Sequence, residues 1–350
     1  MYMTNLAASI APPEPREDAL ARLYAGEPLN QAEAETLFGA LVQGLLDEPT
    51  IAAMLVALRI RGETADELIG AGRALRAADL HFDRPDYLFA DSCGTGGDGA
   101  GTINLSTAVA FVAAAAGLPV AKHGNRSFTS RCGSADVLEH LAVKIDASPE
   151  TSRRALDEAG ICFLFAPQYH PGLKHAGPVR RKLGIRTIMN VLGPCLNPAE
   201  PGVQLLGVAE ERLLEPVALT LAALGVERAM VVHGSGLDEV ALHGETKAIM
   251  MRGGAIEHLA FSPGDVGFSA MPLARIQGGG PEENAERLKA LLFGYGSAAE
   301  KQATALNAGA LLFAAGKAES LREGVEQAFR IVCTAAAHRK LQDLIELSNG

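Results

Sequence analysis

The sequence predicts an α/β protein in which a small helical N-terminal domain precedes a larger domain with a mainly parallel central sheet. Two observations support this fold class. Residues from about 18 to 80 follow a helical pattern with clear start signals. From Tyr87 onward, short apolar runs typical of strands alternate with longer helical segments. Such alternation indicates parallel strands whose faces are covered by helices.

Helix-start signals define the N-terminal domain, which we expect to span residues 1–85. Asn30 with Glu33, and Thr64 with Glu67, have the spacing of capping boxes, in which two side chains satisfy the free N–H groups of a helix start. Gly62 is placed to end the helix between them.

The second domain, expected over residues 86–350, contains five strand candidates that alternate with helices. The strand candidates are YLFADSC (87–93), LPVAKHG (118–124), ICFLFAP (161–167), VQLLGVA (203–209) and ERAMVVHG (227–234). The helices between them are expected at 106–117, 133–142, 149–160 and 213–225. A hairpin is expected around Gly253 and Gly254, and the chain from Pro281 onward is helical in pattern.

Composition excludes several function classes. The 350-residue chain has a formal net charge of −10 and no Trp. An acidic surface disfavours binding to nucleic acid or to an anionic membrane, since phosphate contacts need clustered Lys and Arg. The five cysteines are widely spaced with no CxxC pair, which is typical of reduced thiols in a cytosolic protein. We find no signal-peptide pattern and no apolar run long enough for a membrane span, and therefore expect a cytoplasmic protein.

A glycine-rich loop follows the first strand candidate, in DSCGTGGDGAGTINLSTAVAF (91–111). It literally matches the GxGxxG fingerprint of dinucleotide-binding folds, so a dehydrogenase is a rival interpretation. Two features oppose that rival. The next strand ends in Lys122, His123 and Asn125 where an acid would hold the ribose, and Asp98 lies inside the loop, where a carboxylate would face pyrophosphate.

We interpret the glycine loop as a phosphate site. Its backbone amides can face phosphate, and Asp98 and Ser106 are available to a metal-bound phosphate. Ser106 and Thr107 open a helix whose N-terminus attracts anions. A second loop, KHGNRSFTSRCGSAD (122–136), also follows a strand candidate. It combines Lys and Arg with hydroxyl side chains, a composition that suits phosphate by charge and hydrogen bonding.

Several motifs occur together and in order: CGTGGD, NLST, KHGNRS, CGSADVLE, HPGLKHAGPVRRKLGIRTIMNVLGPCLNP, LDE and GGGPEENAERL. In this the chain resembles the anthranilate phosphoribosyltransferases over nearly its whole length. The resemblance implies a nucleoside phosphorylase/phosphoribosyltransferase-like fold, with a segment near 168–190 returning to the helical domain. It also implies transfer of the phosphoribosyl group from phosphoribosyl pyrophosphate to anthranilate in tryptophan biosynthesis, with Mg²⁺, by a homodimer that associates through its helical part.

The resemblance also implies site residues. The donor-binding positions are Gly94, Gly97, Asp98, Thr102, Asn104, Leu105, Ser106, Thr107, Lys122, His123, Gly124, Asn125, Arg126, Ser127, Phe128, Thr129, Ser130 and Ser134. The anthranilate positions are Gly94, His123, Asn125, His170 and Arg180. The magnesium positions are Ser106, Asp238 and Glu239. One departure is Ser235, which stands where the family commonly has Asp before the GLDE run.

The residue types agree with this chemistry. Asp238 and Glu239 offer hard oxygen ligands of the kind that Mg²⁺ prefers. Arg180 is the candidate partner of the anthranilate carboxylate. We assign no firm catalytic acid or base, because a lone His170 or His175 is more often structural than catalytic. A nucleoside phosphorylase of the same general fold, and a nucleic-acid-binding relative without activity, remain as alternatives.

Overall fold

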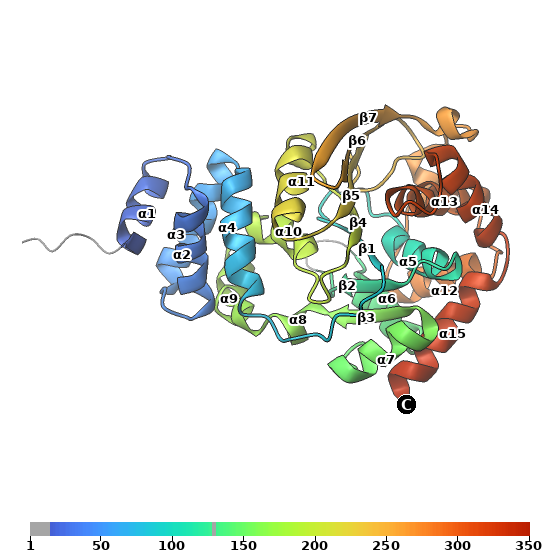
Figure 1. The fold of residues 1–350 in the computed structure, drawn as a ribbon, viewed down its shortest axis with the longest axis horizontal. Helices are drawn as coiled ribbons and strands as arrows, with labels where there is room; N and C mark the ends of the chain where they lie inside the picture. Colours follow the sequence, from blue (N-terminus) through green and yellow to red (C-terminus); the bar gives the residue numbers. More distant parts are fainter. Residues whose placement is uncertain (1–14, 128–130) are drawn as a thin grey trace, which may run out of the picture.

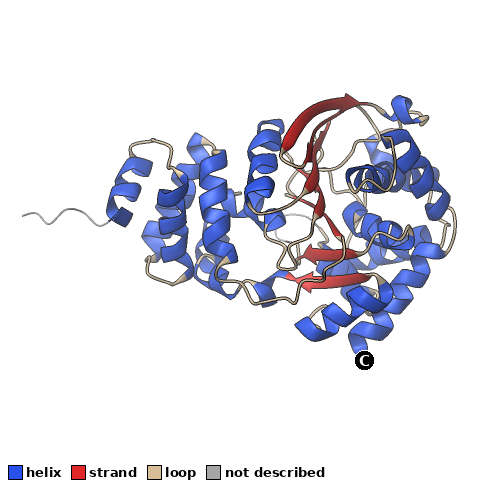
Figure 2. Ribbon diagram, viewed as in Figure 1, coloured by secondary structure: helices blue, strands red, loops and turns tan. Residues whose placement is uncertain are grey.

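The computed structural model describes residues 15–127 and 131–350, and it confirms the predicted fold class (Figures 1 and 2). A helical bundle lies beside a larger unit that is built on one seven-stranded sheet. The predicted donor-binding residues Phe128, Thr129 and Ser130 lie outside the described residues.

The bundle contains α1 (Pro15–Tyr24), α2 (Gln31–Val42), α3 (Glu48–Arg61) and α4 (Ala65–Arg76). Both predicted capping boxes are confirmed, at Asn30 for α2 and at Thr64 for α4. The predicted end of α3 is also confirmed, because Gly62 takes a φ of 91° there, in the left-handed region that favours glycine.

Glu67 does more than cap α4. Its side chain is fully buried, accepts the Leu29 backbone N–H at 3.0 Å and pairs with the Arg61 guanidinium at 2.5 Å. The capping residue thus also ties the start of α4 to α3 and to the connection before α2.

A later segment packs against this bundle. It consists of the short helices α8 (Ala166–Tyr169), η1 (Pro171–His175), α9 (Gly177–Leu183), α10 (Ile188–Leu192) and η2 (Gly193–Cys195). Val179 and Ile188 are buried in the same apolar core as the α2–α4 side chains. Lys182 Nζ lies 2.5 Å from Glu48 Oε2 at the start of α3. Figure 1 shows α10 between α4 and the sheet, and α9 below α4.

The sheet has the strand order β3-β2-β1-β4-β5-β6-β7. The strands are β1 (Ala90–Gly94), β2 (Val120–Gly124), β3 (Ile161–Phe165), β4 (Val203–Gly207), β5 (Arg228–Gly234), β6 (Thr246–Arg252) and β7 (Ala255–Phe261). The first five in spatial order are parallel and the last two pairings are antiparallel. The predicted β6–β7 hairpin is confirmed, with φ of 56° at Gly253 and 83° at Gly254.

Several strand boundaries differ from those predicted, most of all the start of the first strand. The first strand begins at Ala90 rather than at Tyr87. Its neighbours supply a reason, because Ala90 pairs in register with Val120 and Val203, the first residues of β2 and β4. Residues 87–89 therefore lie before the part of the sheet in which β1 pairs with β2 and β4.

Helices cover both faces of the sheet. One face carries α5 (Leu105–Ala115), α6 (Ser134–His140), α7 (Pro149–Ala159), α12 (Pro281–Leu292), α13 (Ala298–Ala314), α14 (Leu321–Val332) and α15 (Ala336–Asn349). The other face, toward the bundle, carries α11 (Leu214–Ala223) (Figure 1). The 3-10 turns η3 (Glu211–Leu213), η4 (Pro263–Val266) and η5 (Leu273–Ile276) lie in the connections.

Alternate residues of β5 divide between the two faces. Met230 and Val232 belong to one apolar core, while Ala229 and Val231 belong to the core shared with the bundle. The bundle is therefore joined to the sheet by a continuous apolar core. Within residues 15–127 and 131–350, no helix combines the length and apolar character needed to cross a lipid bilayer.

Candidate active site

A cavity of about 360 Å³ lies at the carboxyl ends of the parallel strands, where open α/β sheets bind their ligands. The loops after β1 and β2, the turn after β5 and the α8–α10 segment all contribute to its walls. Among the predicted residues, those that line it are Gly94, Gly97, Asp98, Thr102, Asn104, Leu105, Ser106, Lys122, His123, Gly124, Asn125, Arg126, Ser127, Ser134, His170, Arg180, Asp238 and Glu239. The structure thus brings together residues that are up to 145 positions apart in the chain, from Gly94 to Glu239.

The glycine loop has a backbone that only glycine adopts easily. Gly96, Gly97, Gly99 and Gly101 all have φ between 60° and 76°. In the part of the chain that the structure describes, the backbone N–H groups of residues 97–99 make no hydrogen bond. They remain available to an anion, as the sequence interpretation requires.

Two glycines let the turn after β5 lie directly on the strand ends. Gly94 and Gly207 are register partners at the ends of β1 and β4. A Cβ atom on Gly94 would lie 2.2 Å from Asp238 Oδ2, and one on Gly207 would lie 1.6 Å from the Asp238 carbonyl oxygen. Asp238 also accepts the Gly96 backbone N–H at 2.6 Å. Asp238 is therefore fixed against the glycine loop by close backbone contact.

Three carboxylates converge below this loop. Burial, followed by the nearby charge of Asp98, raises the pKa of Asp238 to about 7. Burial and the charge of Asp238 raise the pKa of Glu239 well above its usual range. Lys122 and the Ser106 backbone N–H act in the opposite direction on Glu239. The site therefore disfavours the ionised form of both acids, and a bound cation would stabilise it.

The donor set fits Mg²⁺. Asp98, Asp238 and Glu239 offer oxygen ligands, and Ser106 adds a hydroxyl beside them. Across the described ranges, however, no group of three His, Cys, Asp or Glu side chains is arranged to enclose a metal alone. A cation here would complete its coordination with water and substrate oxygens, which is the usual mode of Mg²⁺ binding.

Lys122 is the buried cation of the site. It is 3 % exposed, and its Nζ donates to the Ser92 carbonyl at 2.7 Å and to Ser106 Oγ at 3.3 Å. These bonds direct the ammonium toward the start of α5. The positive charge thus lies at the junction of the glycine loop, the helix N-terminus and the acids.

The second loop is less cationic than its sequence indicates. The exposed Arg126 guanidinium bonds to both Glu139 oxygens at 2.7 and 2.9 Å, and to Asp136 Oδ1 at 3.3 Å. Asp136 also accepts the backbone N–H groups of Ser127 and Gly133, each at 2.9 Å. Acidic partners on α6 therefore balance much of the charge that was expected for phosphate.

Arg180 and two histidines also line the cavity. Arg180, on α9, is half-buried, and this burial lowers the pKa of its guanidinium. His123 Nε2 lies 3.1 Å from His170 Nε2, and His170 Nδ1 lies 2.5 Å from Asp79 Oδ1. Burial, with the neighbouring His170 and Lys122, lowers the pKa of His123 well below its usual value.

One predicted position, Thr107, does not reach the cavity, and neither does Ser235. Thr107 is fully buried behind the start of α5 and does not line it. Ser235, the departure from the family pattern, lies outside the lining, and its hydroxyl donates to the Glu245 carbonyl at 2.8 Å. Ser235 has a φ of 47°, a conformation that Asp and Asn adopt more readily than Ser.

Sequence reasoning missed three polar residues at the site. Arg186 donates to the Thr95 carbonyl at 3.3 Å and to the Gly96 carbonyl. Asn190 lines the cavity from α10. Asn284, on α12, donates to Asn104 Oδ1 at 3.0 Å. All three lie within motifs that carry the family resemblance, but nothing in their local spacing shows which loop they contact.

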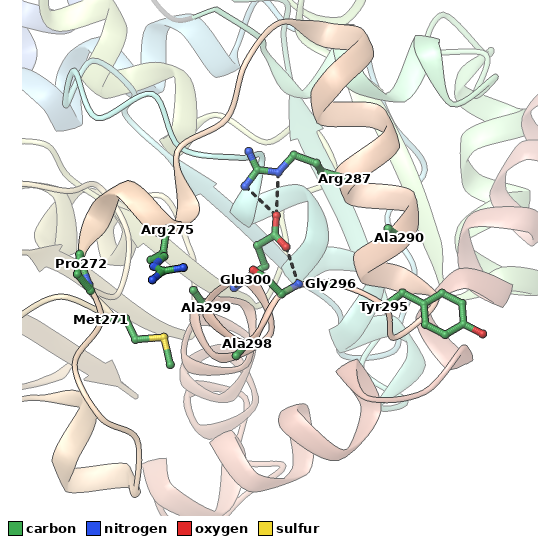
Figure 3. Close-up of a pocket in the computed structure, with 11 residues that line it drawn as sticks. Met271, Pro272, Arg275, Arg287, Ala290, Tyr295, Gly296, Ala298, Ala299 and Glu300 are labelled. Atoms are coloured by element: carbon green, nitrogen blue, oxygen red, sulfur yellow. Dashed lines mark hydrogen bonds and ion pairs between the residues drawn. The ribbon is translucent and has the colours of Figure 1, made fainter.

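A larger hollow of about 700 Å³ lies elsewhere, between η5, α12 and the start of α13 (Figure 3). Its central charges are already paired, since Arg287 and Glu300 lie 2.8 Å apart and Glu300 also caps α13. None of the predicted site residues lines this hollow. Convergent acids and free backbone amides favour the smaller cavity as the candidate active site.

Comparison with known families gives two matches that together span most of the chain. A family model described as "Glycosyl transferase family, helical bundle domain" matches residues 17–78. A second, described as "Glycosyl transferase family, a/b domain", matches residues 86–338.

Individual proteins agree with these matches. The anthranilate phosphoribosyltransferase of Sorangium cellulosum is 53 % identical over 93 % of this chain and 94 % of its own length. That of Shewanella amazonensis is 50 % identical over 94 % of this chain and 96 % of its own. The crystal structure of the Thermus thermophilus enzyme has a TM-score of 0.90 at 42 % identity, covering 95 % of this chain and all of the other. The Saccharomyces cerevisiae enzyme in complex with PRPP and Mg has a TM-score of 0.86 at 26 % identity, covering 95 % of this chain and 97 % of the other.

Proposed function

The chain belongs to the anthranilate phosphoribosyltransferase family, and from this premise we propose that it transfers the 5-phosphoribosyl group of phosphoribosyl pyrophosphate (PRPP) to the amine of anthranilate. Pyrophosphate is the second product, and the reaction is a step of tryptophan biosynthesis. One observation carries the proposal. A single cavity joins the glycine loop and its acids to Arg180 and the paired histidines.

The donor end of the cavity is suited to a phosphorylated sugar. The N–H groups of residues 97–99, which have no hydrogen-bond partner among residues 15–127 and 131–350, can donate to phosphate oxygens, and Lys122 supplies a buried positive charge. Ser106 and Asn104 stand at the N-terminus of α5, where the helix dipole favours anions. These groups would bind the donor and hold its pyrophosphate against the strand ends.

We propose that Ser106, Asp238 and Glu239 hold Mg²⁺. The raised pKa values of the two acids support this assignment, because bound cation and carboxylate charge stabilise each other. When bound, Mg²⁺ neutralises the charge that develops on departing pyrophosphate. Asp98, beside Asp238, adds a further oxygen at the same place.

The acceptor end is suited to an aromatic carboxylate. Arg180 can form a charge-assisted hydrogen bond to the anthranilate carboxylate, and Asn125 offers an amide nearby. Met189, Leu192 and Pro194 give this part of the cavity an apolar wall for the ring. Bound in this way, the amine would face the donor across the cavity, and positioning would supply much of the catalysis.

The test is to incubate the purified protein with PRPP, anthranilate and Mg²⁺ and to follow loss of anthranilate fluorescence together with pyrophosphate release. We expect turnover that requires all three components. A parallel reaction with a pyrimidine nucleoside and inorganic phosphate tests the alternative of a nucleoside phosphorylase. Phosphorolysis in that reaction, without consumption of anthranilate, would overturn the proposal.

The quaternary state and location follow from the same premise. We propose a homodimer that associates through the helical bundle, in support of which Tyr24, Leu45 and Ile60 are 51 %, 59 % and 81 % exposed there. Light scattering at several concentrations tests this.

The five free thiols support a cytoplasmic protein, and we propose no nucleic-acid or membrane partner.

The domain division is also a proposal. We infer that residues 1–85 and the return segment near 168–190 form one domain, and that the rest of 86–350 forms the other. Burial of Val179 and Ile188 with side chains of α2–α4 supports this. Hydrogen exchange tests it, since amides of 177–192 should exchange together with those of the bundle.

A further inference from the structure

Three buried polar side chains from distant parts of the chain form a line that ends at the cavity. Asp79 lies in the connection between α4 and β1, His170 follows α8, and His123 is near the end of β2. The side chains of His170 and Asp79 are 4 % and 9 % exposed, and His123 is 6 % exposed. Both histidines line the cavity, whereas Asp79 does not. Asp79 belongs to none of the motifs that the sequence singled out.

The two short contacts restrict where protons can lie. Asp79 Oδ1 is 2.5 Å from His170 Nδ1, and the two Nε2 atoms are 3.1 Å apart. With Asp79 ionised, His170 donates through Nδ1–H, so its Nε2 carries a lone pair in the neutral ring. An N···N hydrogen bond then requires that His123 donates through Nε2–H. His123 Nδ1 is left as the basic nitrogen. This assignment follows from the hydrogen-bond network.

The surroundings hold this line in place. The Leu80 backbone N–H donates to the Tyr169 carbonyl at 2.7 Å, which joins the residues next to Asp79 and His170. The two imidazole rings meet edge to face, with centroids 5.0 Å apart. Asp79 Oδ2 is buried and has no hydrogen-bond partner among the described residues. The charge of this carboxylate is therefore directed chiefly at His170.

Charged neighbours of Asp79 and His123 also affect the protonation of these two side chains. Burial raises the pKa of the Asp79 carboxyl, whereas His170 and Arg76 lower it and Glu200 raises it. Lys122 acts on His123 from the same strand and disfavours a positive charge there. The Gly193 backbone carbonyl faces the His123 ring and favours the protonated form. His123 is therefore held neutral before reaction, while a proton that it accepts is stabilised by Gly193 and, through His170, by Asp79.

We propose that His123 is the general base that takes the proton of the anthranilate amine, and that Asp79 and His170 are positioning residues that fix its tautomer. The inference rests on the proposed function. As the amine nitrogen forms its bond to C1′ of the ribose, the bond from C1′ to the pyrophosphate oxygen breaks with both electrons. The nitrogen then loses one proton to His123, which becomes an imidazolium. Solvent later removes this proton.

The test compares three variants with the wild-type protein. Asp79→Asn keeps the shape of the side chain, but an amide donates as well as accepts and no longer imposes one tautomer on His170. Asp86→Asn, at an exposed acid of the same connection, makes the same charge change and is the matched control. His123→Ala removes the base, and free imidazole can then be added to replace it.

The first readout separates kcat from KM. Asp79→Asn should lower kcat by about 10- to 100-fold, and His123→Ala by about 100-fold or more, in the range that general-base catalysis contributes. KM for PRPP should stay within about 3-fold, Asp86→Asn should match the wild type, and imidazole should restore part of the kcat of His123→Ala. An unchanged kcat in Asp79→Asn, or an effect confined to KM, would overturn the proposal.

The second readout does not depend on activity. Long-range ¹H–¹⁵N correlation spectra of the histidine rings report which nitrogen carries the proton. We expect Nδ1–H on His170 and Nε2–H on His123 in the wild type and in Asp86→Asn, and loss of this pattern in Asp79→Asn. A His123 ring that is protonated on Nδ1 in the wild type would contradict the relay. Absence of any turnover with PRPP and anthranilate would instead refute the proposed function, while the spectra still decide the tautomers.

Discussion

Replacing Gly94 with Ala tests how closely the metal-site acids depend on the strand ends. The added Cβ would lie 2.2 Å from Asp238 Oδ2 and 2.9 Å from Asp238 Cγ, whereas ordinary contacts begin near 3.4 Å. Asp238 would have to move by about 1 Å to restore normal contact. It has little room to do so, because its backbone carbonyl is packed against Gly207. The backbone of Gly94 has no positive φ, so steric overlap with Asp238 is the dominant effect.

A displacement of that size at a reacting centre costs roughly 100-fold in rate, or about 2.7 kcal/mol. We therefore expect kcat/KM for PRPP to fall by about 100-fold, with a higher Mg²⁺ requirement. The assay measures initial rates at saturating anthranilate over a series of PRPP and Mg²⁺ concentrations. The matched control is Gly160→Ala, because Gly160, after α7 and outside the cavity lining, has a φ of 70° and open space around its Cβ position.

The control separates backbone strain from steric overlap. A positive φ costs Ala about 1–2 kcal/mol, so Gly160→Ala should lower the melting temperature and change kcat/KM by only a few fold. If Gly94→Ala were as active as Gly160→Ala, the reasoning that links Gly94 to Asp238 and the metal would be refuted.

Three further predictions concern the charged groups of the site. The double variant Asp238→Asn, Glu239→Gln should retain its fold but lose most turnover and Mg²⁺-dependent PRPP binding, because the charge of two metal ligands is removed. Titration calorimetry with PRPP and Mg²⁺ measures this loss. Normal activity at limiting Mg²⁺ would exclude the metal assignment. Arg180→Ala should lose about 1.5–3 kcal/mol of the free energy of acceptor binding. This loss corresponds to a rise of roughly 10- to 100-fold in KM for anthranilate, with little change in KM for PRPP. A rise in KM for PRPP alone would show that Arg180 binds the donor instead. The pH profile of kcat should have an acidic limb below pH 6.5, because His123 acts as a neutral base and its pKa is lowered; a limb at or above the usual histidine pKa of about 6.5 would contradict that role.

Local signals in the sequence predicted much of the fold. The capping boxes at Asn30 and Thr64, the helix end at Gly62 and the turn at Gly253 and Gly254 each depend on residues a few positions apart. Alternation of strands and helices then placed the glycine loop and the second loop at the same edge of the sheet. The start of β1 was misjudged because it depends on where β2 and β4 begin.

Long-range pairing explains what the sequence could not show. Arg126 was expected to face phosphate, but Glu139 and Asp136 occupy its guanidinium once α6 folds beside the loop. Asp79 has no motif around it, and only the tertiary structure places it beside His170. Such residues are defined by their partners, which composition and spacing do not specify.

The most direct test of the central claim is a crystal structure of the protein with PRPP, Mg²⁺ and a slowly reacting anthranilate analogue. We expect pyrophosphate against the backbone of residues 94–107, Mg²⁺ on Asp238 and Glu239, and the analogue's carboxylate at Arg180 with its amine toward His123. Donor or acceptor bound outside this cavity, or Mg²⁺ held by other side chains, would contradict it.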